Sequence, residues 1–231
     1  MNCVSPEEQG LSRSAEIEKS SEVLAQLAEG LHAMAQPLTI LRGALGALQL
    51  EQGGEAENRR YVEMSNVQTG RLCRLLTNLR SLIEFAQFPA VCESVDLFEL
   101  AEQIVADNTG VFRDAGVQVT LNKRSGNTAV ALGDSARTEQ AMRSGLDTAI
   151  ELAAVGDEIR WQISPDGFLL ENEHAHGKRL SSPAHVALSV VETAILSQRG
   201  TCTAIEDPFC LSIRLPGVES NVTSEYLKPA V

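Results

Sequence analysis

The chain has 231 residues, of which 43% are hydrophobic and only 4% aromatic, and its formal net charge is −12 at pH 7. A chain of this length can bury one large core or two smaller ones, and its many leucines and alanines favour helix-rich packing. The acidic balance disfavours a nucleic-acid partner, because binding to phosphates requires a basic surface. No apolar stretch approaches the roughly 20 residues that cross a bilayer, and the N-terminus lacks the pattern of a secretory signal. We therefore expect a cytoplasmic protein that binds neither membranes nor nucleic acid.

A seam of apolar residues with a 3.5-residue period runs from about Glu16 to Leu50. Its members follow one another at alternating spacings of three and four: Leu24, Leu27, Leu31, Met34, Leu38, Leu41, Leu45 and Leu48. This period is typical of a helix that packs in a coiled coil or a bundle. Pro37 removes a backbone donor within the seam, but the register continues through it, so we predict one kinked helix.

A second amphipathic helix is predicted from about Ala56 to Gln87, after a short Gln-Gly-Gly turn at residues 52–54. Two long helices on a short connection form an antiparallel hairpin. A lone hairpin would expose its apolar seam, so we expect a homodimer in which two hairpins form a four-helix bundle. We assign this region to residues 20–88, after an N-terminal tail at 1–19.

The pattern changes after Phe88-Pro89-Ala90, where short helices and strands begin to alternate. The predicted helices are Leu97 to about Asp114, Ser135–Leu152 and Pro183–Gln198, with a helix start at Ser94-Val95-Asp96. The predicted strands are Val117–Leu121, Ala129–Leu132, Glu158–Ile163, Phe168–Glu171, Thr201–Ile205 and Phe209–Leu215. This order predicts an α+β sandwich over residues 92–216, with helices on one face of a mixed sheet, followed by a C-terminal tail at 217–231.

The cysteines and histidines of the chain do not indicate a metal site. The cysteines form no CxxC pair, and their odd number is typical of free thiols in a reducing cytoplasm. They are Cys3, Cys73, Cys92, Cys202 and Cys210. His174 and His176 form an HxH pair near Glu171 and Glu173, but no further ligand stands at a convincing spacing. We interpret this stretch as a polar loop and expect no bound metal.

The string from His32 to Gly43 reads His-Ala-Met-Ala-Gln-Pro-Leu-Thr-Ile-Leu-Arg-Gly. It resembles the H-box of sensor histidine kinases, in which proline follows a histidine by five residues and precedes a Leu-Thr-x-apolar-Arg-Gly run. The order of the predicted elements is also similar, because a hairpin precedes an ATPase-like sandwich in that family. The resemblance covers about residues 20–216. It implies that His32 accepts a phosphoryl group.

The chemistry of His32 is reasonable without the family. It directly follows the seam residue Leu31, so it should flank the core and reach solvent. An exposed imidazole is neutral for much of the time near pH 7, and its free nitrogen can attack a phosphoryl group. A lone histidine beside a helical seam is usually a surface residue without chemistry, and only the surrounding motif favours the phosphoacceptor role. The same motif suggests Gln36, Thr39 and Arg42 as partner-binding residues, although Arg42 could equally be solvated.

The departures from the family pattern concern the use of ATP. The acidic residue that usually follows the histidine is replaced by Ala33, and Gln36 stands where asparagine or threonine is usual. Ser144 and Thr148 occupy the positions of the asparagines that bind Mg-ATP, and a shorter hydroxyl lacks the paired donor and acceptor of an amide. The Asp-x-Gly-x-Gly run and the glycine-rich lid are missing, although phosphate-cradling loops need glycine for close backbone approach. We therefore expect a degenerate ATPase domain without a nucleotide cofactor.

These features predict a phosphotransferase more than an autokinase. Some bacterial phosphorelays use dimeric kinase-like proteins with a dead ATPase domain, which move phosphate between the receiver-domain aspartates of response regulators. The chain resembles that group, and His32 would be the relay residue, with Mg²⁺ supplied by the receiver. One alternative is a catalytically dead dimeric scaffold or regulator. Another is a divergent active histidine kinase.

Overall fold

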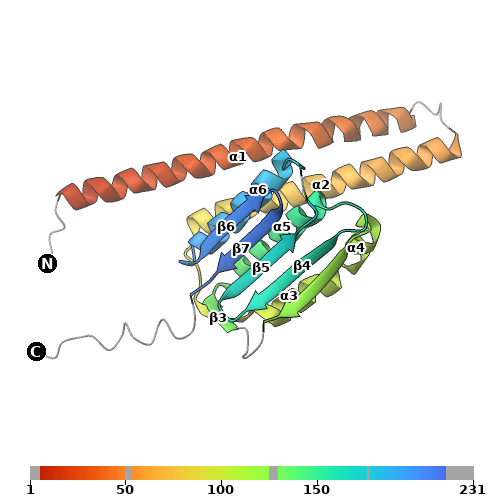
Figure 1. The fold of residues 1–231 in the computed structure, drawn as a ribbon. Helices are drawn as coiled ribbons and strands as arrows, with labels where there is room; N and C mark the ends of the chain where they lie inside the picture. The colour runs from red at the N-terminus through yellow and green to blue at the C-terminus, as the bar shows by residue number, and fades with distance from the viewer. Residues whose placement is uncertain (1–5, 50–53, 125–129, 176, 217–231) are drawn as a thin grey trace, which may run out of the picture. The chain divides into compact units, whose positions relative to one another are not determined.

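The computed structural model describes residues 6–49, 54–124, 130–175 and 177–216, and the side chains within them from Val23 onwards (Figure 1). The chain divides into two compact units, Met1–Ile83 and Glu84–Val231. The first holds the helical hairpin and the second an α+β sandwich, which confirms the predicted fold class. No described helix is long and apolar enough to cross a membrane.

The hairpin consists of α1 (Pro6–Gln49) and α2 (Glu55–Gln87), and the last turn of α2 belongs to the second unit. Helix α1 passes through Pro37 without interruption, as predicted, but begins well before Glu16. The N-terminal segment predicted as a tail, residues 1–19, is thus helical from Pro6 onwards. Proline is favoured in the first turn of a helix, where its missing N–H is not needed, and a helix can extend beyond the apolar seam that marked its predicted start.

The buried face of α1 is made of small residues rather than of the predicted leucine seam. Its buried members are Gly30, Ala33, Pro37 and Ala44. The exposed fraction is 7% for Ala33 and 4% for Ala44. A Cβ atom at Gly30 would collide with the Leu79 side chain of α2, so the two helices approach closely here. Helix α2 contributes larger side chains to its buried face, namely Leu72, Leu75, Leu79 and Leu82 together with Ser65 and Gln68.

The sandwich is built on a five-stranded mixed sheet. Its order is β2 (Gln118–Lys123), β4 (Glu158–Ser164), β5 (Gly167–Asn172), β7 (Phe209–Arg214) and β6 (Thr201–Glu206). Strands β2 and β4 are parallel, and the other neighbours are antiparallel. A separate antiparallel pair joins β1 (Glu93–Asp96) to β3 (Val130–Gly133).

The helices of the sandwich cover one face of the sheet (Figure 1), as the sequence predicts. They are α3 (Leu97–Asp107), α4 (Thr109–Ala115), α5 (Ser135–Leu152) and α6 (Ser182–Leu196). Ile159, Trp161 and Ile163 alternate along β4 and are fully buried, with the sole tryptophan at the centre of the core. The four cysteines that the structure describes are free thiols, and burial raises the pKa of Cys202 to about 11.

Three details of the sandwich differ from the predictions. Strand β1 was not predicted, because only one of its four residues is buried. The predicted helix from Leu97 to Asp114 is two helices, which divide at Asn108, whose side-chain amide donates to the Ile104 carbonyl at 2.8 Å. Strand β3 pairs with β1 and not within the main sheet. The predicted helix start is confirmed, since Asp96 accepts from two backbone amides of α3.

Arg137, in the first turn of α5, joins several segments of the second unit. Its guanidinium donates to the Phe85 carbonyl at 3.4 Å, to the Phe88 carbonyl, and to Ser197 Oγ at 2.6 Å. It also lies 3.5 Å from the Asp134 carboxylate and stacks over the Phe85 ring, 4.9 Å from its centroid. The side chain is 5% exposed. The end of α2 and the segment after it are thereby attached to the ends of α5 and α6.

Candidate functional site

His32 lies on the exposed surface of α1. It directly precedes Ala33, which is 7% exposed, so its imidazole stands on the flank of the buried face, as the sequence suggested. Gln36 and Thr39 follow it by four and seven residues and therefore share its side of the helix. Both are exposed. Three of the four predicted site residues are thus brought together on one strip of α1.

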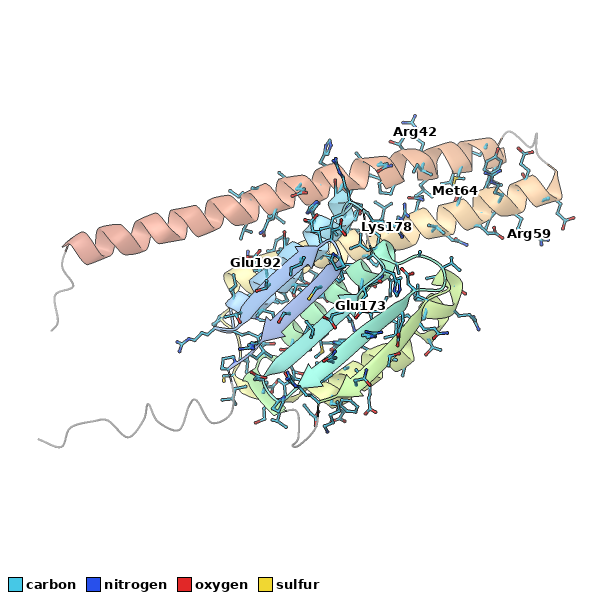
Figure 2. The ribbon with its side chains drawn as sticks, viewed as in Figure 1. Arg42, Arg59, Met64, Glu173, Lys178 and Glu192 are labelled. Carbon is cyan, nitrogen blue, oxygen red and sulfur yellow. The ribbon has the colours of Figure 1, made fainter. Side chains whose placement is uncertain are left out.

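Arg42, the fourth predicted site residue, lies further around the helix. It is exposed, and Figure 2 shows its side chain projecting outward from α1. Ten residues separate it from His32, which corresponds to about three helical turns. It can contact a partner that covers this part of α1, but it cannot touch the imidazole itself.

Small residues occupy two of the four positions one turn from His32, and Glu29 and Gln36 occupy the other two. Ala28 and Ala35, one turn before and after it, are exposed, as is Gly43 further along the same side. No bulky side chain of α1 therefore covers the imidazole from these positions. A partner domain could place a reacting group directly against the ring.

Pro37 changes the backbone hydrogen bonds beside this strip. Because proline has no N–H, the Ala33 carbonyl loses the donor that the fourth residue onward normally supplies. Thr39 Oγ1 donates to the Ala35 carbonyl at 2.8 Å, which fixes the threonine rotamer. The Thr39 oxygen remains able to accept a hydrogen bond from a partner.

The two flanks of the hairpin have different chemistry. Along α1, the residues that directly follow the buried positions 30, 37 and 44 are leucines, which form an exposed heptad stripe. Its members are Leu24 (65% exposed), Leu31 (64%), Leu38 (49%) and Leu45 (47%). On α2, the exposed residues Leu76 and Ile83 directly follow buried Leu75 and Leu82, and exposed Val62 lies two heptads before Leu76.

These two stripes lie on the same side of the hairpin. Two antiparallel helices are related by a twofold axis perpendicular to the plane that contains both helix axes. This rotation exchanges the helices but leaves the two sides of that plane unchanged. Residues that directly follow a buried residue therefore lie on the same side of the hairpin in both helices. We call this surface, Leu24, Leu31, Leu38, Leu45, Val62, Leu76 and Ile83, the apolar flank. His32 precedes its buried neighbour instead of following it. It therefore lies toward the opposite flank.

The positions of the family's Mg-ATP asparagines are inside the core of this chain. Ser144 is 2% exposed and Thr148 is 1% exposed, and both lie on the buried face of α5. The Thr148 hydroxyl donates to the Ser144 carbonyl at 2.9 Å, and Gln140 donates to Ser144 Oγ at 3.2 Å. Their polar atoms are thus engaged within the helix and do not face a ligand.

The segment after β5 also differs from a nucleotide-binding loop. Asn172 ends β5 fully buried, accepts from the His174 amide at 3.1 Å and contacts Asp157 at 3.4 Å. Ala175 and Leu180 are buried members of the hydrophobic core. The segment thereby fills the interior with its own side chains, where a glycine-rich loop would leave its backbone open to phosphate.

The polar groups around this segment form a local network. The Ala154 amide donates to Asp157 at 2.7 Å, and this bond is the main reason that the pKa of the Asp157 carboxyl is lowered. Lys178 donates to the Ala153 carbonyl at 2.7 Å. Among the described residues, no group of three or more histidine, cysteine or acidic side chains could hold a metal ion. His176 of the HxH pair lies outside them.

We predict that restoring an asparagine does not restore a nucleotide site. Ser144→Asn adds two heavy atoms to a position that is 2% exposed, and such overpacking typically costs about 1–3 kcal/mol. The free energy of unfolding should fall, and calorimetry with a non-hydrolysable ATP analogue and Mg²⁺ should detect no binding. Ser144→Ala, which adds no volume, serves as the control. Tight binding of the analogue by the asparagine variant would contradict this account.

Comparison with known proteins assigns the class of fold. No family model and no curated protein matches the chain. Solved structures, however, share the arrangement of a hairpin followed by an α+β sandwich, and they are histidine kinases. The chain therefore has the fold of the sensor histidine kinases, as the resemblance at His32 implied.

Three solved structures illustrate this likeness. The histidine kinase AdeS of Acinetobacter baumannii is 20% identical, with a TM-score of 0.58 over 81% of this chain and 98% of the AdeS chain. The histidine kinase ThkA, in complex with the response regulator protein TrrA, is 15% identical, with a TM-score of 0.65 over 95% of this chain and 69% of that one. The cytoplasmic segment of the histidine kinase QseC is 14% identical, with a TM-score of 0.51 over 63% and 93%.

Proposed function

We propose that the chain is a histidine phosphotransferase of a bacterial two-component phosphorelay. His32 would take a phosphoryl group from the aspartate of one receiver domain and give it to another, without ATP. The observation that carries this proposal is a contrast between the two units. The hairpin exposes its histidine, whereas the sandwich buries the residues at the positions where the family binds Mg-ATP.

The transfer step needs only an accessible imidazole and a docked receiver. A neutral ring nitrogen of His32 attacks the phosphorus of the aspartyl phosphate, an N–P bond forms, and the P–O bond to the aspartate breaks. The carboxylate leaves with the electron pair, and the other ring nitrogen can release its proton to water. Transfer to the second receiver is the same step in reverse. Mg²⁺ on the receiver neutralises charge on the phosphoryl oxygens.

The partners follow from this chemistry and from the apolar flank. Response-regulator receiver domains would dock over His32, Gln36, Thr39 and Arg42, and the solved complex of ThkA with TrrA supports such a partner.

The apolar flank would pack against a second copy to form a four-helix bundle, because an exposed heptad stripe on both helices favours burial in a dimer. Since His32 faces away from that flank, dimerisation leaves it accessible.

The test is transfer from a phosphorylated receiver domain in the presence of Mg²⁺. We expect radiolabel on the wild-type chain, none on His32→Gln, and full labelling of His185→Gln, a control at another exposed histidine. Acid-labile, base-stable label identifies phosphohistidine. If no receiver of the host's full set labels the wild-type chain, the proposal is wrong.

A scaffold without phosphotransfer is the alternative that one observation favours. Ala33 is apolar and buried in the hairpin, so no acid directly after His32 can take up a proton. A dimeric regulator would retain binding to its partner in His32→Gln and keep its signalling phenotype. Loss of signalling in that variant, with binding and dimerisation intact, supports transfer. Binding of an ATP analogue by the wild-type chain would instead favour a divergent kinase.

A further inference from the structure

We propose that three arginines, Arg42 of α1 with Arg71 and Arg74 of α2, form a cationic frame around His32 that selects an acidic protein surface. The inference rests on the proposed phosphotransfer and deepens it. It assigns partner recognition to the second helix, which the sequence motif did not mark. The partner it implies carries several carboxylates around its phosphoryl group.

The first observation is the distribution of charge along the hairpin. Residues 30–49 and 64–83 contain four arginines and not one aspartate or glutamate. The whole chain has a net charge of −12, so the remaining residues carry −16. Glu29, which is exposed one turn before His32, lies just outside these segments, so the positive charge lies on the side of His32 toward Gln36. Such a separation of charge orients an acidic partner toward one site and repels it elsewhere.

The second observation is the side of the hairpin on which the arginines lie. Arg71 directly precedes buried Leu72, and Arg74 directly precedes buried Leu75. This is the same offset that His32 has from buried Ala33 on α1. By the twofold relation of antiparallel helices, Arg71 and Arg74 share with His32 the flank opposite the apolar flank. A homodimer would therefore leave them accessible with the histidine.

The third observation is their level along the hairpin. Gly30 of α1 meets Leu79 of α2, so His32 stands opposite residue 77 on the antiparallel neighbour. At about 1.5 Å per residue, Arg74 lies about 5 Å and Arg71 about 9 Å from the level of His32, toward Gln36. These are separations along the hairpin axis, to which the distance of about 8–10 Å between packed helices adds, so the charges act on a group at the imidazole most strongly at low salt. A group bound at the imidazole would feel both charges.

The fourth observation is that these charges are not neutralised locally. Arg42, Arg71 and Arg74 are exposed, and within the described part of the chain none of them has an ion-pair partner. By contrast, Arg59 near the other end of α2 lies 3.8 Å from Glu55. Figure 2 shows Arg59 at that end of the helix and Arg42 projecting from α1. The frame is available to an external anion.

The occupant that fits is a receiver-type pocket in which carboxylates surround a phosphorylated aspartate. Arginine pairs with carboxylate and phosphoryl oxygens through its planar fork of donors, which favours it over lysine at such contacts. Rim charges of this kind act mainly on the association rate, and their effect weakens as salt rises. The frame therefore sets which partner reaches His32 and how fast.

The experiment compares Arg71→Gln/Arg74→Gln with the matched control Arg59→Gln/Arg60→Gln, which removes the same charge from the same helix. Transfer from a phosphorylated receiver to His32 is timed at low and high salt. We expect the first variant to react about tenfold more slowly at low salt, with the difference shrinking at high salt. The control should match the wild type. Arg71→Lys/Arg74→Lys should restore most of the salt dependence, since it restores the charge.

A small phosphodonor separates recognition from chemistry. Phosphoramidate can phosphorylate an accessible imidazole without docking, so it should label wild type and Arg71→Gln/Arg74→Gln equally, with helical content unchanged by circular dichroism. Equal transfer rates and equal salt dependence for both double-glutamine variants would overturn this inference while leaving phosphotransfer intact. Absence of any receiver-driven label on wild type would instead refute the proposed function.

Discussion

Replacement of Arg137 by methionine is expected to lower the free energy of unfolding of the sandwich by about 3 kcal/mol. Methionine keeps much of the apolar stem but removes every donor of the guanidinium. The Phe85 and Phe88 carbonyls and the Ser197 hydroxyl lose a partner, and the Asp134 carboxylate, 14% exposed, loses its counter-charge. Leaving buried polar groups unpaired costs far more than a surface ion pair supplies.

The electrostatics of Arg137 agree with this expectation. Burial lowers the pKa of its guanidinium, and the neighbouring Asp134 acts in the opposite direction. Arginine nevertheless stays charged at any pH at which the protein folds. The Asp134 carboxylate also accepts from the Val91 amide at 2.9 Å and caps α5 at the Arg137 amide. Loss of the arginine thus weakens a cap and a linker contact together.

The measurement is urea unfolding followed by the fluorescence of Trp161, the sole tryptophan, which is fully buried in the sandwich. Arg143→Met on the same helix is the control, because its side chain is 31% exposed and pairs with Asp107 and Glu139 near the surface. That change should cost less than about 1 kcal/mol. Hydrogen exchange should also accelerate at residues 85–91 in the Arg137 variant alone. Equal losses in both variants would contradict the proposed role of Arg137.

Replacement of Leu38 by glutamate is expected to convert the proposed dimer into monomers. Leu38 lies in the middle of the apolar flank and is 49% exposed in the single chain, so a carboxylate there remains solvated in the isolated hairpin. In the bundle, two such charges would be buried against apolar side chains and against each other. Desolvating an unpaired carboxylate costs several kcal/mol, so the dimer dissociation constant should rise at least about a hundredfold.

Sedimentation equilibrium or light scattering across a concentration series measures this change. Gln36→Glu introduces the same charge two residues away, on the side that carries His32, and should leave the dimer intact. Helical content should be equal in the two variants, because neither position is buried within the hairpin. A dimer that withstands Leu38→Glu would show that the apolar flank is not the dimer interface.

The order of elements could be predicted from the sequence because each has a strong local signal. The Ser135–Leu152 helix was predicted with its observed bounds, and the structure shows that Asp134 caps its start. Short strands with one buried residue, such as β1, lack such a signal. The pairing of β3 with β1 depends on contacts distant in sequence, which no local pattern encodes.

The leucine seam shows a different limit of sequence reasoning. Its 3.5-residue period correctly predicted a packed helix, but it did not distinguish the face that packs on α2 from the face left open. The face that packs on α2 is made of glycine, alanine and proline. These residues contribute little to an apolar sequence pattern but permit close contact between helices. The choice of His32 depended on the motif, and its exposure followed from its place beside the seam. Arg71 and Arg74 carried no motif and became visible only through the register of the hairpin.

The burial of Ser144 and Thr148 restricts substitution at both positions. A point mutation at either position meets a filled interior, and the two positions lie one helical turn apart on the buried face of α5, so their effects would not be independent. The loop after β5 is also occupied by its own core residues. A larger polar side chain at residue 144 or 148 would therefore require compensating changes in its neighbours. Under the proposed function, the phosphoryl group is accordingly supplied by a partner.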